Sequence, residues 1–215
     1  MFIKSPINTF FHLYPLKRYL KGIDGFISGG CFKNVFKHQK IRDIDIFFKN
    51  QEDFDKAVKF YKSKYKKAFE NDNCIAFTDS KNGMQIELVR SIFGIPEEIM
   101  DNFDFTIVKA CLVKVEPNRQ LEEAINQAAN LLREEPEKES SYEFIYHDKF
   151  FEHLLCNKLV IDDRMPKSVA TFNRVLKYTG YGFGLCRESK IKLVEAIKAE
   201  GNSNDINGEL YFGFD

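Results

Sequence analysis

Two aspartates separated by one residue, with a pair of glycines shortly before them, constrain this chain more than any other feature. The sequence contains Ser28-Gly29-Gly30 and then Asp43-Ile44-Asp45-Ile46. Because side chains alternate between the two faces of a strand, Asp43 and Asp45 would project to the same side, within reach of one divalent ion. Paired glycines allow the backbone to approach a phosphate closely. This layout is typical of a metal-dependent nucleotide site.

Length and composition allow a globular protein with one sizeable core. Of 215 residues, 44% are hydrophobic and 30% are charged, which is ordinary for a soluble globular protein. The length also allows a head with a smaller appendage, and we expect two unequal units. No apolar run approaches a membrane span, and the first residues lack the successive regions of a secretory signal. We therefore expect a cytoplasmic location and no membrane partner.

Charge and cysteine usage disfavour several kinds of function. The 32 basic and 32 acidic residues give zero net charge, so no global field attracts the chain to nucleic acid. A local patch at Lys62, Lys64, Lys66 and Lys67 stays open, although a solvated helix end is the commoner role of such a cluster. The five cysteines are far apart and never form a Cys-x-x-Cys pair. Neither a disulfide framework nor a zinc site is expected.

The first part of the chain alternates helix and strand patterns. Residues 9–21 have helical spacing, with a bend expected at Pro15. Strands are predicted at 25–28 and 41–48, with a short buried helix between them. Asn50 followed by Asp53 is typical of a helix start, and this helix is expected to run to about residue 67.

A hairpin and a further strand follow. Residues 73–78 and 84–90 flank a turn that contains Asn-Gly, so they are expected to pair. A short helix over 96–102 should precede a strand over 103–115. Residues 121–132 are predicted to be helical.

A change of composition at 133–143 indicates a boundary. This segment consists mostly of Glu, Lys, Ser and Pro and has little to bury, which favours a linker or exposed loop. Beyond it, helical spacing over 144–159, 167–178 and 187–199 predicts a small bundle. We therefore expect a head domain over 1–132, a linker over 133–143 and a helical C-terminal domain over 144–215.

A third carboxylate would complete the expected chemistry. Transfer of a nucleotidyl group depends on positioning and on neutralising triphosphate charge more than on covalent catalysis. A third acid beside the ion can coordinate it and help to deprotonate an attacking hydroxyl. Glu87 is the first candidate, because three acids converge if its strand pairs beside the strand of Asp43. Asp104 is the rival for this role.

Each signal also has a simpler structural explanation. An Asp-x-Asp pair is common on half-exposed strands, and Gly-Gly is most often a turn. Taken alone, Glu87 is explained as a solvated residue on an amphipathic strand. Asp104 is explained as a residue that caps or stabilises a neighbouring loop. Only the order and spacing of these motifs together favour a functional site.

Taken in order, the motifs resemble those of the nucleotidyltransferase superfamily of the DNA polymerase beta type. Within it, the likeness is to the head domain of bacterial poly(A) polymerases and class II CCA-adding enzymes. Those heads carry Gly-Gly-x-x-Arg-Asp, Asp-x-Asp, a strand with Glu followed by Arg, and Arg-Asp-Phe-Thr-Ile-Asn. The corresponding runs here begin at Gly29, Asp43, Ile86 and Phe103 and cover roughly the first half of the chain. The resemblance implies an α+β fold: a nucleotidyltransferase-type mixed sheet flanked by helices, followed by a small helical C-terminal unit.

The resemblance implies roles for the first three motifs. Asp43 and Asp45 would bind two magnesium ions (Mg²⁺), with Glu87 as the third acid. Ser28-Gly29-Gly30 would hold the triphosphate. Lys33 stands where the family has Arg and would still neutralise phosphate, as a point charge.

The later motifs are implied to shape the nucleotide pocket. The segment Asp104-Phe105-Thr106 would contact sugar and base. Arg90 would brace a carboxylate or touch phosphate, with a structural salt bridge as the alternative. Arg174 lies in a helix that looks like the family's neck helix, and the resemblance implies that it approaches the nucleotide. The alternative is that this segment is a plain amphipathic helix in which Arg174 has no contact with a nucleotide. Asn34 and Val108 depart from the family pattern, which leaves nucleotide selectivity open.

The expected activity is magnesium-dependent transfer of a nucleotidyl group from a nucleoside triphosphate (NTP) to a hydroxyl acceptor. ATP is the expected donor. A tRNA or RNA 3′ end is one acceptor, suggested only by the family likeness, and a small molecule or a protein hydroxyl stays open. The competing hypothesis is a module that keeps the fold, lacks turnover and binds nucleotide or serves in an assembly.

Overall fold

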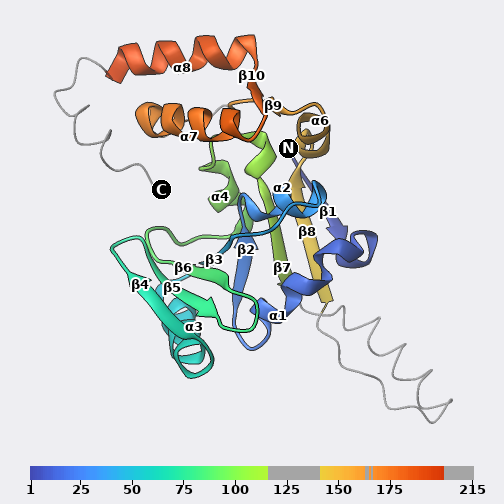
Figure 1. Ribbon diagram of the computed structural model, residues 1–215, viewed down its shortest axis with the longest axis vertical. Helices are drawn as coiled ribbons and strands as arrows, with labels where there is room; N and C mark the ends of the chain where they lie inside the picture. The colour runs from blue at the N-terminus through green and yellow to red at the C-terminus, as the bar shows by residue number, and fades with distance from the viewer. Residues whose placement is uncertain (116–140, 163–164, 166, 201–215) are drawn as a thin grey trace.

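A mixed sheet of eight strands forms the centre of the computed structural model, which describes residues 1–115, 141–162, 165 and 167–200 (Figure 1). The strand order is β1-β8-β7-β2-β3-β6-β5-β4. β3 and β6 pair in parallel, and the other neighbours pair antiparallel. The strands are β1 Phe2–Pro6, β2 Gly25–Ser28, β3 Asp43–Phe48, β4 Lys66–Glu70, β5 Cys74–Asp79, β6 Met84–Val89, β7 Ala110–Val115 and β8 Ser141–His147.

Helices surround this sheet, and α7 and α8 lie together beyond its end, at the top of Figure 1. A short parallel pair, β9 Lys158–Leu159 and β10 Gly184–Leu185, lies beside them. The α-helices are α1 Lys17–Leu20, α2 Cys31–Phe36, α3 Gln51–Lys64, α4 Pro96–Asp101, α6 Phe150–Leu155, α7 Ser168–Gly180 and α8 Arg187–Glu200. The 3₁₀ helices are η1 Ile7–Thr9, η2 Phe11–Leu16 and η3 Thr106–Val108. The expected α+β class, with a mixed sheet flanked by helices, is confirmed.

The two faces of the sheet have different environments, because residues alternate along β3. Ile44, Ile46 and Phe48 are buried in the larger core, to which α3 also contributes its apolar side. Asp43 and Asp45 point to the other face. On that face α4 packs against β2 and β7. Asp43 is exposed there, and Asp45 is half-buried.

The helix α3 begins where the sequence predicts and ends earlier. The side chain of Asn50 accepts a hydrogen bond from the backbone N–H of Asp53 at 2.9 Å, which caps the helix. The helix ends at Lys64, and Lys66–Glu70 forms the edge strand β4 instead of a last helical turn. The prediction of helix to about residue 67 is therefore wrong, because pairing with β5 overrides a run of good helix formers.

The predicted strand over 103–115 is also only partly correct. β7 begins at Ala110, and the preceding residues form a loop and the 3₁₀ helix η3. Phe105, Thr106 and Ile107 are all buried in this irregular segment. A short buried apolar run does not distinguish a strand from a packed loop by its pattern alone.

The prediction of a helix over 144–159 is wrong as well. Ser141–His147 forms β8, which lies between β1 and β7, and only Phe150–Leu155 is helical. Apolar side chains of β8 contribute to both cores, with Phe144 in one and Ile145 in the other. The sheet thus includes residues on both sides of the expected boundary, and the division into domains stays a prediction. The predicted helix at 121–132, the positions 133–140 and the tail at 201–215 lie outside the described residues.

The helices that the structure describes include none that combines the length and apolar character needed to cross a lipid bilayer.

Candidate functional site

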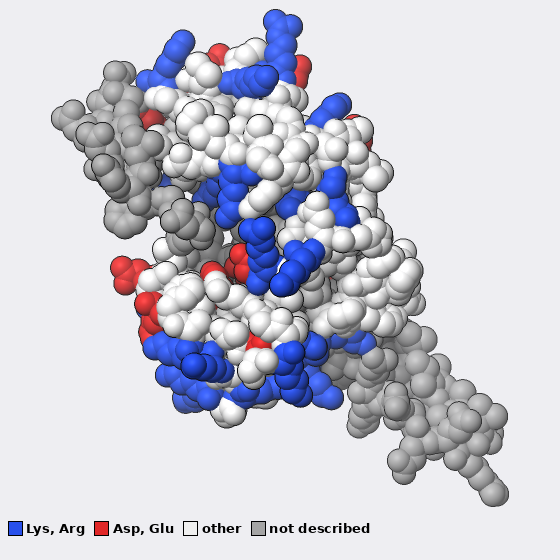
Figure 2. Space-filling view, viewed as in Figure 1, with Lys and Arg blue, Asp and Glu red and all other residues white. Residues whose placement is uncertain are grey.

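Two adjoining pockets lie between the sheet and α7. The larger has a volume of about 600 Å³ and the smaller about 230 Å³. Gly30, Asp45 and Tyr178 line both, so the two form one cleft. Figure 2 shows acidic side chains in a hollow near the centre of the view, with basic side chains around it.

The β2–α2 turn brings glycine backbone next to Asp45. Ser28 lies directly opposite Asp45 in the antiparallel pair of β2 and β3. Gly29 follows with a φ of +104°, and a Cβ atom there would lie 3.4 Å from Asp45 Oδ2. Glycine adopts such a φ readily and leaves room beside the carboxylate. The Ser28 hydroxyl is buried and donates to the carbonyl oxygen of Ala110 at 2.8 Å, so it ties β2 to β7.

The parallel pairing of β3 with β6 brings Glu87 beside the two aspartates. Glu87 is the register partner of Asp45, and this strand pairing is the condition on which the predicted convergence of the three acids depends. Burial raises the pKa of Asp45 to about 8, and the negative charges of Glu87 and Asp43 add to the shift. The Glu87 carboxylate accepts a hydrogen bond from Gln85 Nε2 at 2.6 Å and contacts Cys74 Sγ at 3.5 Å.

Carboxylate oxygens are the ligands that Mg²⁺ prefers, and a cation would relieve the repulsion at Asp45. By donor type and charge, Asp43 and Asp45 therefore fit a magnesium ion. Within the described residues, no three His, Cys, Asp or Glu side chains are grouped closely enough to hold a metal ion. A third ligand is thus not in place, and Glu87 instead bonds Gln85 and Cys74.

Basic side chains line the larger pocket. Lys33 is 5% exposed, and its Nζ lies 5.0 Å from the centre of the Tyr181 ring and also contacts the Asn34 side chain. Burial lowers the pKa of Lys33, and nearby Lys37 adds to this effect. The other basic residues that line this pocket are Lys40, Arg42 and Lys177. Such a set of cations is suited to phosphate groups.

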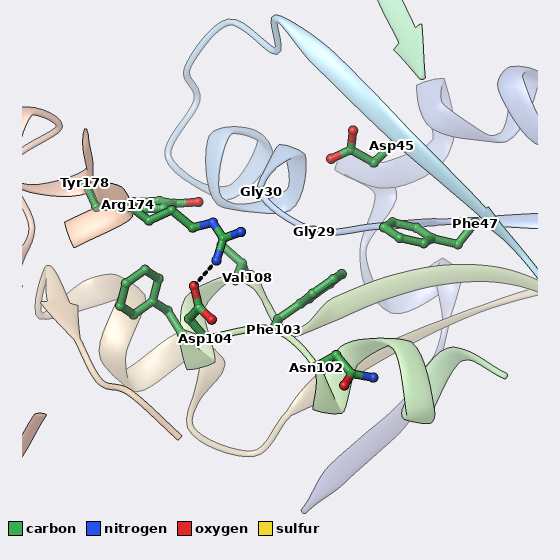
Figure 3. Close-up of a pocket in the computed structure, with 11 residues that line it drawn as sticks. Gly29, Gly30, Asp45, Phe47, Asn102, Phe103, Asp104, Val108, Arg174 and Tyr178 are labelled. Carbon is green, nitrogen blue, oxygen red and sulfur yellow. Dashed lines mark hydrogen bonds and ion pairs between the residues drawn. The ribbon is translucent and has the colours of Figure 1, made fainter. Parts of the chain in front are cut away.

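The smaller pocket combines aromatic side chains with polar ones, among them Asp45, Asn102 and one ion pair (Figure 3). Asp104 is buried, and its Oδ2 accepts from Arg174 Nη1 of α7. The other carboxylate oxygen of Asp104, Oδ1, has no hydrogen-bond partner among the residues that the structure describes. Figure 3 shows the Arg174 guanidinium pointing to Asp104, with Asp45 farther away, beyond the glycine turn. Aromatic side chains complete the pocket: Phe47, Phe103 and Phe105.

Not every predicted site residue lies in the cleft. Arg90 forms an ion pair with Glu70 at 3.0 Å, the structural salt bridge that the sequence left open, and neither pocket includes it. Thr106 is buried, and its Oγ1 lies 2.8 Å from His153 Nδ1. Ser28 faces Ala110, as described above. These three residues contribute contacts to the fold around the cleft, and Glu87 also lines neither pocket.

The sequence reasoning missed the aromatic wall of the cleft. Tyr178 and Tyr181 line it from α7 and the residue that follows, beside Arg174, which had been predicted as a nucleotide contact. The spacing of Arg174, Tyr178 and Tyr181 places all three on one side of a helix, and this stripe was the available signal. Asn102 has no comparable pattern in the sequence.

Solved structures with the same fold are CCA-adding enzymes and tRNA nucleotidyltransferases. The Thermotoga maritima CCA-adding enzyme in complex with tRNA has a TM-score of 0.58 and 14% identity, and the match covers 92% of this chain and 46% of that one. A tRNA nucleotidyltransferase with a primer tRNA and an incoming ATP analog has a TM-score of 0.52 and 14% identity, with 87% and 50% covered. The fold is therefore of the nucleotidyltransferase type. The chain spans about half the length of these enzymes.

The family assignment comes from the sequence itself. Residues 1–156 match the family model described as Gabija anti-defense 2 family protein, Gad2. The chain belongs to this family. No curated protein matches the sequence.

Proposed function

We propose that this protein is a magnesium-dependent nucleotidyltransferase that transfers a nucleotidyl group from an NTP, with ATP as the expected donor, to a hydroxyl acceptor. The observation that carries the proposal is the register of β3 and β6, which brings Glu87 beside Asp45 and Asp43, next to the Gly29 turn. The cationic lining of the same cleft, including buried Lys33, supports it.

Asp43 and Asp45 would hold the magnesium ions, with Glu87 as the third acid. Bound magnesium would supply neutralisation of the triphosphate and activation of the acceptor hydroxyl. In the reaction, the acceptor oxygen bonds to the α-phosphorus, the bond from that phosphorus to its bridging oxygen breaks, and pyrophosphate leaves. The hydroxyl proton passes to a carboxylate of the cluster, for which Glu87 is our candidate.

The other residues of the cleft would bind and orient the nucleotide. Lys33 and Lys177 would neutralise the leaving pyrophosphate charge. The turn at Gly29 and Gly30 leaves backbone open to a phosphate. The apolar pocket around Phe103, closed by the Asp104–Arg174 pair, would hold the base and sugar.

The acceptor is the least constrained part of the proposal. Two of the similar structures contain tRNA by their titles, which supports an RNA 3′ end. The zero net charge of this chain disfavours a firm grip on a large RNA. A small molecule or a protein hydroxyl is an alternative acceptor.

A second function is favoured by one observation. Glu87 is bonded to Gln85 and Cys74, and the described residues contain no group of three metal ligands. A module that binds nucleotide without turnover, and acts through a partner, is compatible with this arrangement and with the anti-defense description of the family.

Incubation with labelled ATP or CTP and Mg²⁺ tests both functions, with RNA, protein and metabolite pools supplied separately. We expect label transfer that Asp45→Asn abolishes. The matched control is Asp24→Asn, which makes the same change at an exposed position and should leave transfer intact. Magnesium-dependent nucleotide binding without transfer would favour the silent module. Neither binding nor transfer would exclude both.

A further inference from the structure

The hydroxyl group of Tyr178 lies inside the cleft, beside the glycine turn. A Cβ atom at Gly30 would lie 3.3 Å from the Tyr178 hydroxyl oxygen. Figure 3 shows this oxygen directed from α7 towards Gly30, with the Asp45 carboxylate beyond the turn. Tyr178 thus directs a hydroxyl from the C-terminal part of the chain towards the candidate catalytic acids.

The place of Tyr178 in the cleft corresponds to one part of a bound nucleotide. Tyr178, Gly30 and Asp45 are the residues that line both pockets, so they mark the junction between them. In the proposed function the smaller pocket holds the base and sugar, and cations of the larger pocket neutralise the leaving pyrophosphate. The α-phosphate connects these two parts of an NTP. It would therefore lie at the junction, near the Tyr178 hydroxyl.

Aromatic contacts hold the Tyr178 ring in this orientation. Its centre lies 5.5 Å from that of Phe105, 5.9 Å from that of Tyr181 and 6.1 Å from that of Phe183. The interplanar angles, 69° to 86°, are those of edge-to-face packing. The hydroxyl is therefore positioned by the fold before any ligand binds.

The Tyr178 hydroxyl has no hydrogen-bond partner in the part of the chain that the structure describes. A tyrosine hydroxyl removed from water usually has one, as that of Tyr61 does at 2.6 Å from the carbonyl oxygen of Tyr19. Burial and the nearby charge of Asp45 raise the pKa of Tyr178, so the hydroxyl keeps its proton in the free protein. A hydroxyl group is thus left without a partner at the place where the α-phosphate is expected.

Two simpler roles for Tyr178 are possible, and they differ in what they predict. As part of the aromatic wall alone, Tyr178 would need no hydroxyl, and an unpartnered hydroxyl away from water costs free energy. As a hydrogen-bond donor to a phosphate, it would assist binding and form no covalent product. Only an acceptor role predicts a modified chain.

We propose that the Tyr178 hydroxyl is itself an acceptor, so that the protein transfers a nucleotidyl group to its own chain. The phenolic oxygen bonds to the α-phosphorus of the NTP, the bond from that phosphorus to its bridging oxygen breaks, and pyrophosphate leaves. The phenolic proton passes to a carboxylate of the acidic cluster, and the product is a tyrosyl phosphodiester. The inference rests on the proposed function, because it names a hydroxyl that the same site modifies.

Incubation of the full chain with labelled ATP or CTP and Mg²⁺, without any added acceptor, tests the inference. We expect a covalently labelled chain that carries about one nucleotidyl group, because the group is attached to one side chain. Tandem mass spectrometry of the peptides should locate the group on Tyr178. Tyr178→Phe and Asp45→Asn should each reduce the label to the background level.

Controls separate the loss of the hydroxyl from a general effect of substitution. Tyr14→Phe removes the hydroxyl of a tyrosine that is 45% exposed and lines neither pocket, so this variant should be labelled like the wild type. Tyr178→Phe keeps the ring that packs against Phe105, so thermal unfolding should show it to be at least as stable as the wild type. The mapped peptide identifies the modified residue even if this variant fails to fold.

Two outcomes would overturn the inference and leave the proposed function in place. The first is transfer of label to an added acceptor by a chain that does not become labelled itself. The second is label on another residue of the chain. A label that dilute acid releases would indicate a phosphoramidate, for which Lys33 is the nearby amine.

The remaining outcomes overturn the inference together with the proposed activity. Magnesium-dependent nucleotide binding without transfer to the chain or to any acceptor pool would favour the silent module. Neither binding nor transfer would exclude a nucleotide site in the cleft.

Discussion

At the residue scale, the cleft contains ionisable groups that the fold removes from water. Asp45 lies beside two other acids, Lys33 is nearly covered by aromatic rings, and Asp104 has one carboxylate oxygen without a partner. Burial of charge without full compensation costs free energy. Buried charges of this kind are tolerated where a bound ligand supplies the missing partners. Substitution of a buried charge that has no partner should therefore raise the stability of the ligand-free protein and impair its function.

Asp45→Asn should stabilise the metal-free protein while abolishing transfer. The pKa of Asp45 rises from 3.8 to about 8 on folding, so the native state binds this proton more tightly than the unfolded state. The free energy of unfolding therefore falls as pH rises between these values. The gain from Asn should be small near pH 4 and reach about 1 kcal/mol or more at pH 8, since one pKa unit corresponds to about 1.4 kcal/mol.

Urea unfolding in EDTA at several pH values measures this gain. Asp24→Asn is the control for the loss of an exposed carboxylate. A gain that does not grow with pH would contradict the account of Asp45.

Glu87→Gln should lower turnover by roughly a hundredfold, the usual effect of losing a general base. Asp104→Asn is the comparison variant, because Asp104 is the rival candidate for the third acid. This substitution removes the charge that Arg174 binds and should lower the free energy of unfolding by about 1–3 kcal/mol. Turnover and urea unfolding are measured for both variants. If Glu87→Gln retains full turnover, Glu87 is not the third acid.

At the element scale, the site depends on one turn and one pair of strands. The β2–α2 turn requires the positive φ of Gly29, and the parallel pairing of β3 with β6 sets Glu87 beside Asp45. The turn and both strands lie within the described residues. The geometry of the proposed site thus depends on this turn and on regular strand pairing.

Gly29→Ala should destabilise the protein by about 1–2 kcal/mol and weaken nucleotide binding. An L-residue at this φ is strained, and the added Cβ lies 3.4 Å from Asp45 Oδ2. Gly180→Ala is the control, because a Cβ there meets nothing within 4 Å, and its effect should be neutral. Thermal unfolding and nucleotide titration provide the measurements. Equal effects of the two substitutions would contradict the role of the turn.

The sequence predicts elements with strong local signals and fails where partners are distant. The Asp-x-Asp strand, the glycine turn and the hairpin of β5 and β6 follow from short-range spacing, and the structure forms these elements as expected. β4 and β8 exist through pairing with other strands, which overrides helical patterns in their sequences. The ion pair of Asp104 with Arg174 joins residues far apart in sequence, and no local pattern specifies it.

At the scale of the whole molecule, polar side-chain contacts join the segment that precedes β7 to the C-terminal part of the chain. Arg174 binds Asp104, Lys109 Nζ binds Asp162 Oδ2 at 2.7 Å, and Thr106 contacts His153. Lys109 is almost fully buried. Of these contacts, only the pair of Arg174 with Asp104 involves α7, so the position of Tyr178 on the same helix should depend most on that pair.

Two histidines at this junction should make stability depend on pH. Burial lowers the pKa values of His147 and His153 below 6.5, so the unfolded state binds more protons on mild acidification. Their contribution to stability is present above pH 6.5 and is lost as pH falls through the native pKa values. His153→Gln should therefore reduce the loss of stability between pH 7 and pH 5.

Urea unfolding at the two pH values checks this effect. His12→Gln, a change at an exposed position, should leave the difference unaltered. If His153→Gln loses as much stability between pH 7 and pH 5 as the wild type, His153 does not contribute to this pH dependence.

The facing ends of β7 and β8 offer a practical route to a shorter protein. Val115, the last residue of β7, is the register partner of Ser141, the first residue of β8. A two-residue turn such as Asn-Gly is able to connect antiparallel strands at this point. Replacement of positions 116–140 by such a turn should give a shorter protein that keeps the pairing of β7 with β8 and the cleft.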